Sequence, residues 1–192
     1  VNLLYGENPN KAVRAFTKPF HEASIQTHML DRGLNGLRMY PVPADVRRLM
    51  YKVKHAQGVD ITRIFCGLNE VRNIIPSIHY ALEAGMIPQA TLCITFSPVH
   101  TVEYYTAIAE RLIEAGAPEI CLKDMAGVGR PEMLGRLTKA IKERHPEIII
   151  QYHGHSGPGL SMASILEVCE NGADIIDVAM EPISWGKVHP DV

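Results

Sequence analysis

The feature that most constrains the fold is a regular alternation of short apolar runs with longer amphipathic stretches. The apolar runs predict strands at Ser24–Leu30, Ile61–Phe65, Ala90–Phe96, Glu119–Lys123, Ile148–His153 and Asp174–Val178. The stretches between them carry apolar residues at helical spacing, and they predict helices at Ala44–His55, Asn73–Ala84, Val102–Ala115, Pro131–His145 and Leu160–Asn171. Strands that alternate with helices in this way indicate an α/β protein with a parallel sheet.

The number of repeats favours a (β/α)8 barrel of the TIM type that is incomplete. Such a barrel needs eight strands and usually about 250 residues, whereas we count about six β/α units in 192 residues. We therefore expect residues 1–192 to be one barrel domain that lacks its first two strands and its C-terminal closure. The start at Val1, without an initiator Met, indicates a fragment of a longer protein. A doubly wound open sheet is the structural alternative, but no G-x-G-x-x-G turn supports it.

Composition and charge exclude several classes of protein. The net charge of −2 comes from interspersed charges, so the chain lacks the basic stripe of a nucleic-acid-binding protein. No apolar run approaches the about 20 residues that span a bilayer, and the first residues do not resemble a signal peptide. The four cysteines form no C-x-x-C pair, and three of them lie inside apolar runs, so reduced core thiols are expected. We therefore predict a cytoplasmic protein without a membrane span.

The strongest chemical signal is the segment Q-Y-H-G-H at residues 151–155, at the end of a predicted strand. Barrel enzymes place their chemistry at the C-terminal ends of strands. Side chains two positions apart along a strand face the same way, so His153 and His155 can converge on one ion. Imidazole suits Zn, Mn, Fe or Co. The alternative is that these are two loop histidines that hydrogen-bond locally.

The second signal is Lys123, which an apolar strand delivers at its last position before Asp124. An ammonium group has no acceptor, so it cannot bind a metal as it stands. It could hold a substrate anion, or act as a neutral base if burial lowers its pKa. It could also react with carbon dioxide to form a carbamate, whose oxygens are anionic ligands. The alternative is an ion pair between Lys123 and Asp124.

Taken together and in order, several segments resemble the carboxyltransferase domain of biotin-dependent enzymes. That domain is shared by pyruvate carboxylase, the alpha subunit of oxaloacetate decarboxylase and the pyruvate-binding subunit of transcarboxylase. The resemblance rests first on I-C-L-K-D-M-A-G at residues 120–127 followed by H-x-H at 153–155. Residues 30–36 resemble the L-x-R-G-x-N segment, residues 63–69 resemble R-[IV]-F-D-x-L-N, residues 97–101 resemble the decarboxylase and transcarboxylase branch, and residues 172–179 resemble the last strand. The similarity extends over residues 24–190.

The resemblance implies an enzyme that moves a carboxyl group between biotin and a ketoacid, pyruvate or oxaloacetate, through an enolate. It implies a divalent metal (Zn, Mn or Co) held by a carbamylated Lys123, by His153 and by His155. The family's fourth ligand is an aspartate in an R-D-x-H-Q-S segment, which this chain does not contain. Biotin would be attached to a separate carrier domain or subunit, because the A-M-K-M signature is absent. The family commonly forms oligomers, so a homo-oligomer is expected.

On the substrate side, the resemblance assigns the ketoacid carboxylate to Arg32, whose guanidinium matches a carboxylate bidentately. Asn69 and His100 are further candidates for substrate contacts. Lys187 stands where the family has a threonine that relays a proton. The other departures from the family pattern are Cys66 in place of an aspartate, Met39 next to Tyr40 in place of a tyrosine, and Ser156-Gly157-Pro158 after H-x-H. These departures leave the substrate less constrained than the metal and the fold.

Two other functions remain open. One is a metal-dependent lyase or Claisen-type condensing enzyme of the related H-x-H barrels, such as the hydroxymethylglutaryl-CoA lyase or isopropylmalate synthase group. Those enzymes typically carry G-D-T where this chain has K-D-M at 123–125, so Lys123 favours the carboxyltransferases. The other is a non-catalytic scaffold relative, which the substrate-side departures support weakly.

Overall fold

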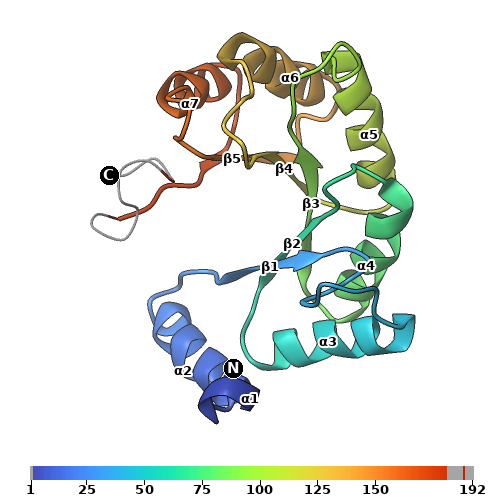
Figure 1. The fold of residues 1–192 in the computed structure, drawn as a ribbon, viewed down its shortest axis with the longest axis vertical. Coiled ribbons are helices and arrows are strands. Elements are labelled where there is room, and N and C mark those ends of the chain that lie inside the picture. The colour runs from blue at the N-terminus through green and yellow to red at the C-terminus, as the bar shows by residue number, and fades with distance from the viewer. Residues whose placement is uncertain (1, 181–187, 189–192) are drawn as a thin grey trace.

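The computed structural model describes residues 2–180 and residue 188, and Figure 1 shows how their elements are arranged. Two helices, α1 (Asn2–Tyr5) and α2 (Pro9–Glu22), precede the sheet. The strands are β1 (His28–Arg32), β2 (Ile61–Phe65), β3 (Ile87–Cys93), β4 (Glu119–Asp124), β5 (Ile149–Gly154) and β6 (Ile175–Ile176). The helices between them are α3 (Ala44–Ala56), α4 (Val71–Glu83), α5 (Val102–Glu114), α6 (Pro131–Arg144) and α7 (Ser161–Glu170). Within residues 2–180, no helix has both the length and the apolar character that crossing a membrane requires.

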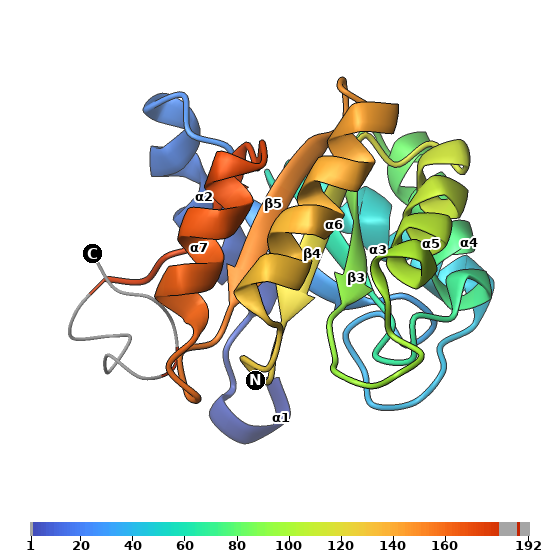
Figure 2. The ribbon, with the colours of Figure 1, turned by 90° about the horizontal axis from the view of Figure 1, so that it is seen from above.

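The six strands form one parallel sheet in which every strand pairs with the strand before it, in the order β1-β2-β3-β4-β5-β6. A doubly wound sheet reverses its strand order at a switch point, and this sheet does not. Helices α3 to α7 lie in an arc along the outer side of the sheet (Figure 1), and Figure 2 shows α5, α6 and α7 side by side in front of the strands. The predicted partial TIM-type barrel is therefore confirmed.

The sheet is curved strongly enough for strands that are not neighbours to meet across its inner side. Arg63 Nη1 on β2 lies 2.6 Å from Asp177 Oδ2, which directly follows β6. Three strands, β3 to β5, separate these two positions in the sheet. A flat sheet would hold the two strands about 19 Å apart, at about 4.8 Å per neighbour. The inner side of the sheet therefore faces the lumen of the partial barrel.

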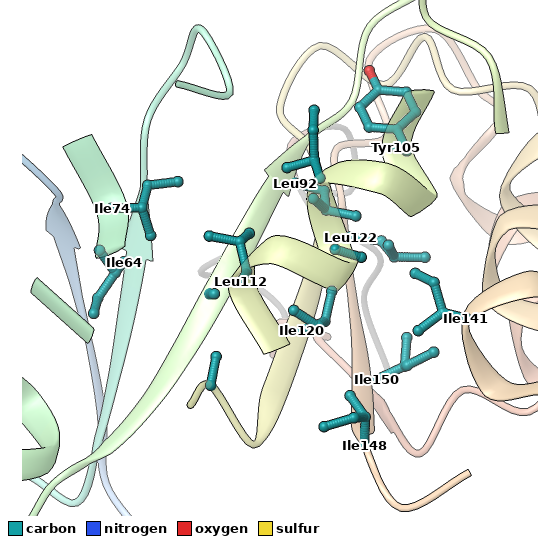
Figure 3. Close-up of a cluster of buried hydrophobic side chains, with 14 of the residues drawn as sticks. Ile64, Ile74, Leu92, Tyr105, Leu112, Ile120, Leu122, Ile141, Ile148 and Ile150 are labelled. Carbon is teal, nitrogen blue, oxygen red and sulfur yellow. The ribbon is translucent and has the colours of Figure 1, made fainter. Parts of the chain in front are cut away.

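The outer side of the sheet carries the hydrophobic core. Ile120 and Leu122 of β4 and Ile150 of β5 are completely buried. Figure 3 shows these side chains together with Leu112 and Tyr105 of α5, between the strands and the covering helices. Full burial of one such aliphatic side chain contributes about 1.5–3 kcal/mol. The alternating residues of the same strands point into the lumen, which is where the polar side chains lie.

The structure differs from the predicted elements most at the N-terminus and in strands β1, β3 and β6, and β6 has two residues where five were predicted. Helix α2 was not predicted, although Asn8 caps it by accepting from the N–H groups of Asn10 and Lys11 at 3.1 and 3.3 Å. Pro19 inside this helix obscured the helical pattern. Strand β1 lies further along the chain than predicted. Strand β3 begins and ends three residues earlier than predicted, and it includes Pro88, which pairs with Thr62 of β2.

Candidate functional site

The register of β4 and β5 brings the predicted lysine and histidine together. Lys123 is the direct partner of His153 across the two strands, and Cys93 on β3 is the partner of Lys123 on the other side. Neighbouring parallel strands lie about 4.7–4.9 Å apart. Both side chains point into the lumen, because the residues before them, Leu122 and Tyr152, are buried in the outer core.

The two histidines of the H-G-H segment face each other through the same ring nitrogen. His153 Nε2 lies 3.2 Å from His155 Nε2, and the rings meet edge to face at an interplanar angle of 66°. Two imidazole nitrogens that bind one zinc ion tetrahedrally, each at 2.0–2.1 Å, are about 3.3 Å apart. The observed separation therefore fits two nitrogen ligands of a single ion. Gly154 between them lies so close to the Tyr152 hydroxyl that a side chain there would collide with it.

The loop after β4 fixes the position of His155. The backbone N–H of His155 donates to the carbonyl oxygen of Asp124 at 3.1 Å. Gly127 has a left-handed backbone, with φ of +67°, and a Cβ there would run into the carbonyl oxygen of His155. The Asp124 carboxylate accepts from the N–H groups of Val128 and Gly129 at 3.0 and 2.8 Å. The turn after β4, which contains Gly127, thus supports the second histidine.

Lys123 is buried in the lumen and is not paired with Asp124 in the described part of the chain. Its Nζ lies 4.9 Å from the centroid of the Phe65 ring, and 6% of the residue is exposed. Burial lowers the pKa of the Lys123 amine, and the positive charge of Arg63 adds to this effect. Asp124 faces the opposite side of the strand, because side chains alternate. The ion-pair alternative for Lys123 is therefore wrong.

Asp177 and Arg63 complete this cluster, and neither was predicted as a site residue. Asp177 Oδ2 lies 2.6 Å from His153 Nδ1, and Arg63 Nη1 approaches the same oxygen at 2.6 Å. Burial would raise the pKa of Asp177, but the hydrogen bonds from His153 and Arg63 hold it well below its ordinary value. The pKa of His153 is lowered, chiefly by burial. The only sequence signal for Asp177 was a carboxylate at the end of the last strand.

Arg32 lies at the end of β1, beside a small pocket of about 150 Å3 that Asn35, Cys66 and Asn73 also line. Its Nη1 donates to the carbonyl of Arg38 at 3.0 Å and approaches Met39 Sδ at 3.2 Å. The next residue along the chain, Gly33, packs so tightly against the carbonyl of Asn73 that a side chain there would overlap it. The start of the loop after β1 is therefore held in place beside Arg32.

Two other predicted site residues, Asn69 and His100, are held by hydrogen bonds of their own. The Asn69 side chain donates to the carbonyl of Cys93 at 2.9 Å and accepts from its N–H at 2.7 Å, so the amide joins two strand ends. His100 Nδ1 lies 2.7 Å from Ser97 Oγ, and His100 lines a pocket of about 360 Å3 with residues of α5 and α6. Lys187 lies outside the described residues. The structure thus brings Lys123, His153 and His155 together, whereas Asn69 bonds the backbone of Cys93 and His100 lines a separate pocket.

Known proteins resemble this chain in sequence and in fold. A family model described as HMGL-like matches residues 67–183. A pyruvate carboxylase subunit of Methanocaldococcus jannaschii is 38% identical, over 96% of this chain and 32% of the relative. The methylmalonyl-CoA carboxyltransferase 5S subunit of Propionibacterium freudenreichii subsp. shermanii is 34% identical, over 95% of this chain and 36% of the relative.

Among solved structures, the carboxyl transferase domain from Rhizobium etli pyruvate carboxylase with pyruvate superposes with a TM-score of 0.91. The two are 30% identical in sequence, and the match covers 98% of this chain and 32% of that one. The chain spans about a third of the length of these relatives.

Proposed function

The chain belongs to the HMGL-like family, and from this premise we propose that it is part of a biotin-dependent carboxyltransferase. The enzyme would move a carboxyl group between biotin and a ketoacid, pyruvate or oxaloacetate, through an enolate. The observation that carries this proposal is the convergence of Lys123, His153 and His155 on the lumen side of β4 and β5. The names of the relatives, pyruvate carboxylase and methylmalonyl-CoA carboxyltransferase, support the same reaction class.

The donor set supports a divalent metal, Zn, Mn or Co, held by the two Nε2 atoms and by a carbamate on Lys123. The 3.2 Å separation of the Nε2 atoms is consistent with two ligands of one ion. Imidazole and anionic oxygen ligands both suit these metals. When bound, the metal would supply Lewis acidity that stabilises the negative charge of an enolate.

The surroundings of Lys123 favour carbamate formation. Its lowered pKa increases the fraction of neutral amine, which is the form that attacks carbon dioxide. The amine nitrogen would bond to the carbon of carbon dioxide and lose one proton, which leaves one negative charge on the carbamate oxygens. This charge would offset the nearby positive charge of Arg63.

Arg32 would hold the carboxylate of the ketoacid at the mouth of the barrel. Its position beside a small pocket with Asn35 and Asn73 supports this role, because guanidinium and amide groups donate to carboxylates. We also propose that Asn69 and His100 contact the substrate and that Lys187 relays a proton. The same proposal includes a biotin carrier domain or subunit as partner, and a homo-oligomeric assembly.

The test is to replace Lys123 by Ala in the full-length protein and to measure two quantities. Metal content and isotope exchange between pyruvate and oxaloacetate should both fall to background, because the variant lacks the amine. Lys139→Ala is the matched control, since Lys139 is an exposed lysine of α6 and is paired only loosely with Glu143 at 3.9 Å. Survival of both quantities in Lys123→Ala would show that the assignment is wrong.

A further inference from the structure

The side chain of His153 is held from behind by a carboxylate on the neighbouring strand end. Asp177 Oδ2 lies 2.6 Å from His153 Nδ1, whereas the other ring nitrogen, Nε2, faces His155. We propose that Asp177, anchored by Arg63, is a positioning residue that fixes the ring orientation and tautomer of His153, so that Nε2 is the metal-binding nitrogen. This inference rests on the proposed function, since it assigns a role to residues behind the proposed metal site.

The direction of the hydrogen bond determines the tautomer. An ionised carboxylate only accepts hydrogen bonds, so the proton between the two groups belongs to Nδ1 of His153. A neutral imidazole with its proton on Nδ1 carries its lone pair on Nε2. The guanidinium of Arg63, whose Nη1 lies 2.6 Å from Oδ2, pairs with this carboxylate. Partners of this kind commonly fix the orientation of metal-binding histidines.

Arg63 reaches Asp177 from the opposite wall of the lumen and fixes the carboxylate in turn. Its Nη1 and Nη2 lie 2.6 and 3.3 Å from the two oxygens of Asp177, and its Nε donates to Gln89 Oε1 at 2.6 Å. The side chain of Arg63 is 7% exposed. Nη1 also approaches His153 Nδ1 at 3.3 Å, farther than the 2.6 Å between that nitrogen and Asp177 Oδ2. A planar guanidinium with these fixed contacts has little freedom to rotate. The orientation of Asp177 is therefore set by β2 and β3 as well as by its own strand.

The network also reaches Glu119, which contacts neither Asp177 nor His153 directly and provides a matched control, and Gln151, which donates to Asp177 Oδ1. Gln89 Nε2 donates to Glu119 Oε2 at 2.8 Å and to Gln151 Oε1 at 2.6 Å. Glu119 is buried and lies at the start of β4, at the other end of the strand from Lys123. If the network only stabilises the barrel, Glu119→Gln and Asp177→Asn should behave alike. If Asp177 positions His153, only Asp177→Asn should affect metal binding.

The experiment measures the affinity of metal-free, full-length protein for Zn2+ by competition with a chromophoric chelator. Asp177→Asn should bind Zn2+ about 10–100-fold more weakly than the natural protein, the range expected for loss of such a partner. Glu119→Gln should stay within about threefold, because the Glu119 carboxylate accepts from Gln89 at the far end of the strand. Equal affinities in Asp177→Asn and Glu119→Gln would overturn the inference.

A spectroscopic measurement tests the tautomer independently of the enzyme's activity. In metal-free protein labelled with 15N-histidine, the His153 resonances should report a proton on Nδ1, and Asp177→Asn should give a mixture of tautomers. If Asp177→Asn does not fold, Arg63→Lys replaces it, because lysine keeps the charge but cannot contact Asp177 and Gln89 with one fixed fork. If Arg63→Lys folds and neither its Zn2+ affinity nor the tautomer of His153 changes, Arg63 does not anchor Asp177.

His153→Ala and His155→Ala separate this inference from the proposed function. If both variants bind Zn2+ as tightly as the natural protein, the proposed metal site is wrong, and the positioning role falls with it. If both lose Zn2+ while Asp177→Asn retains it, the metal site stands and only the positioning role is wrong. The expected result is loss in both histidine variants and partial loss in Asp177→Asn.

Discussion

The two faces of β4 and β5 are formed by alternate residues of the same strands, yet they have opposite chemistry. On the outer face, Ile120, Leu122 and Ile150 are completely buried against helices. On the inner face, Lys123 and His153 are also largely buried, but their neighbours are charged or polar side chains. The apolar face gains stability from burial. The polar face buries ionisable groups, which burial alone disfavours.

The comparison shows that stability and chemistry are separated by single positions along one strand. Adjacent residues that are buried to a similar degree should therefore respond differently to substitution. Outer-face variants should lower the free energy of unfolding, and inner-face variants should lower metal binding with little loss of stability.

Leu122→Ala should produce the largest loss of stability. Leu122 is completely buried in the outer core, so its truncation removes apolar contacts and leaves a cavity. The free energy of unfolding should fall by about 2–5 kcal/mol, as measured by urea denaturation. Leu166→Ala on α7 is the control, because Leu166 is 63% exposed and its loss should change stability by less than about 0.5 kcal/mol. Equal losses in the two variants would contradict the division between the faces.

Gly127→Ala tests whether the loop after β4 determines the position of His155. An alanine there must adopt a φ of +67° and place its Cβ against the carbonyl oxygen of His155. We expect a loss of about 1–3 kcal/mol in the free energy of unfolding, together with weaker Zn2+ binding, because the His155 backbone must move. Gly157→Ala in the neighbouring loop is the control, since nothing lies within 4 Å of the added Cβ.

If Gly127→Ala weakens stability but leaves Zn2+ affinity equal to that of Gly157→Ala, the loop does not position the second histidine. Measurement of thermal unfolding and Zn2+ affinity on the same samples separates the two effects. The result extends the comparison of the two faces to the loop after β4, because Gly127 belongs to neither face of the strand.

Local sequence patterns were sufficient to predict most of this fold. The strand at Ile61–Phe65 has the predicted bounds, because its apolar run is uninterrupted. The period of two along β4 and β5 also predicted that His153 and His155 could converge, and their Nε2 atoms do face each other. Alternation should equally have excluded an ion pair between Lys123 and Asp124, since adjacent residues face opposite sides of a strand.

What the sequence did not reveal depends on contacts across the lumen. Arg63 and Asp177 are 114 positions apart in the chain, and they meet only because the sheet curves. The number of β/α units indicated a barrel, but no local pattern indicates which residues meet across its lumen. In the same way, the β3 boundaries depend on pairing with β2, which accommodates Pro88 opposite Thr62. Such features require the tertiary arrangement and cannot be predicted from propensity alone.

The smallest effect on stability is expected for Lys123→Met, next to Leu122 on the same strand. The pKa of Lys123 is lowered by burial, so its charge disfavours the folded state at neutral pH. A methionine of similar length removes that charge and keeps the packing, so the free energy of unfolding should change by less than about 1 kcal/mol or increase. The measurement is urea denaturation of metal-free protein at pH 7, beside Leu122→Ala.

The pH dependence of the stability difference between the natural protein and Lys123→Met shows whether the folded protein favours the neutral or the charged lysine. The unfolded lysine titrates near 10.5 and the folded one below that value. Between the two pKa values the unfolded state binds more protons, so the stability of the natural protein should rise with pH relative to Lys123→Met. Below the folded pKa the difference should be constant. A natural protein that instead loses stability relative to Lys123→Met as the pH approaches 10 would mean that the lumen favours the charged lysine, and the contrast between the two faces would not hold at this position.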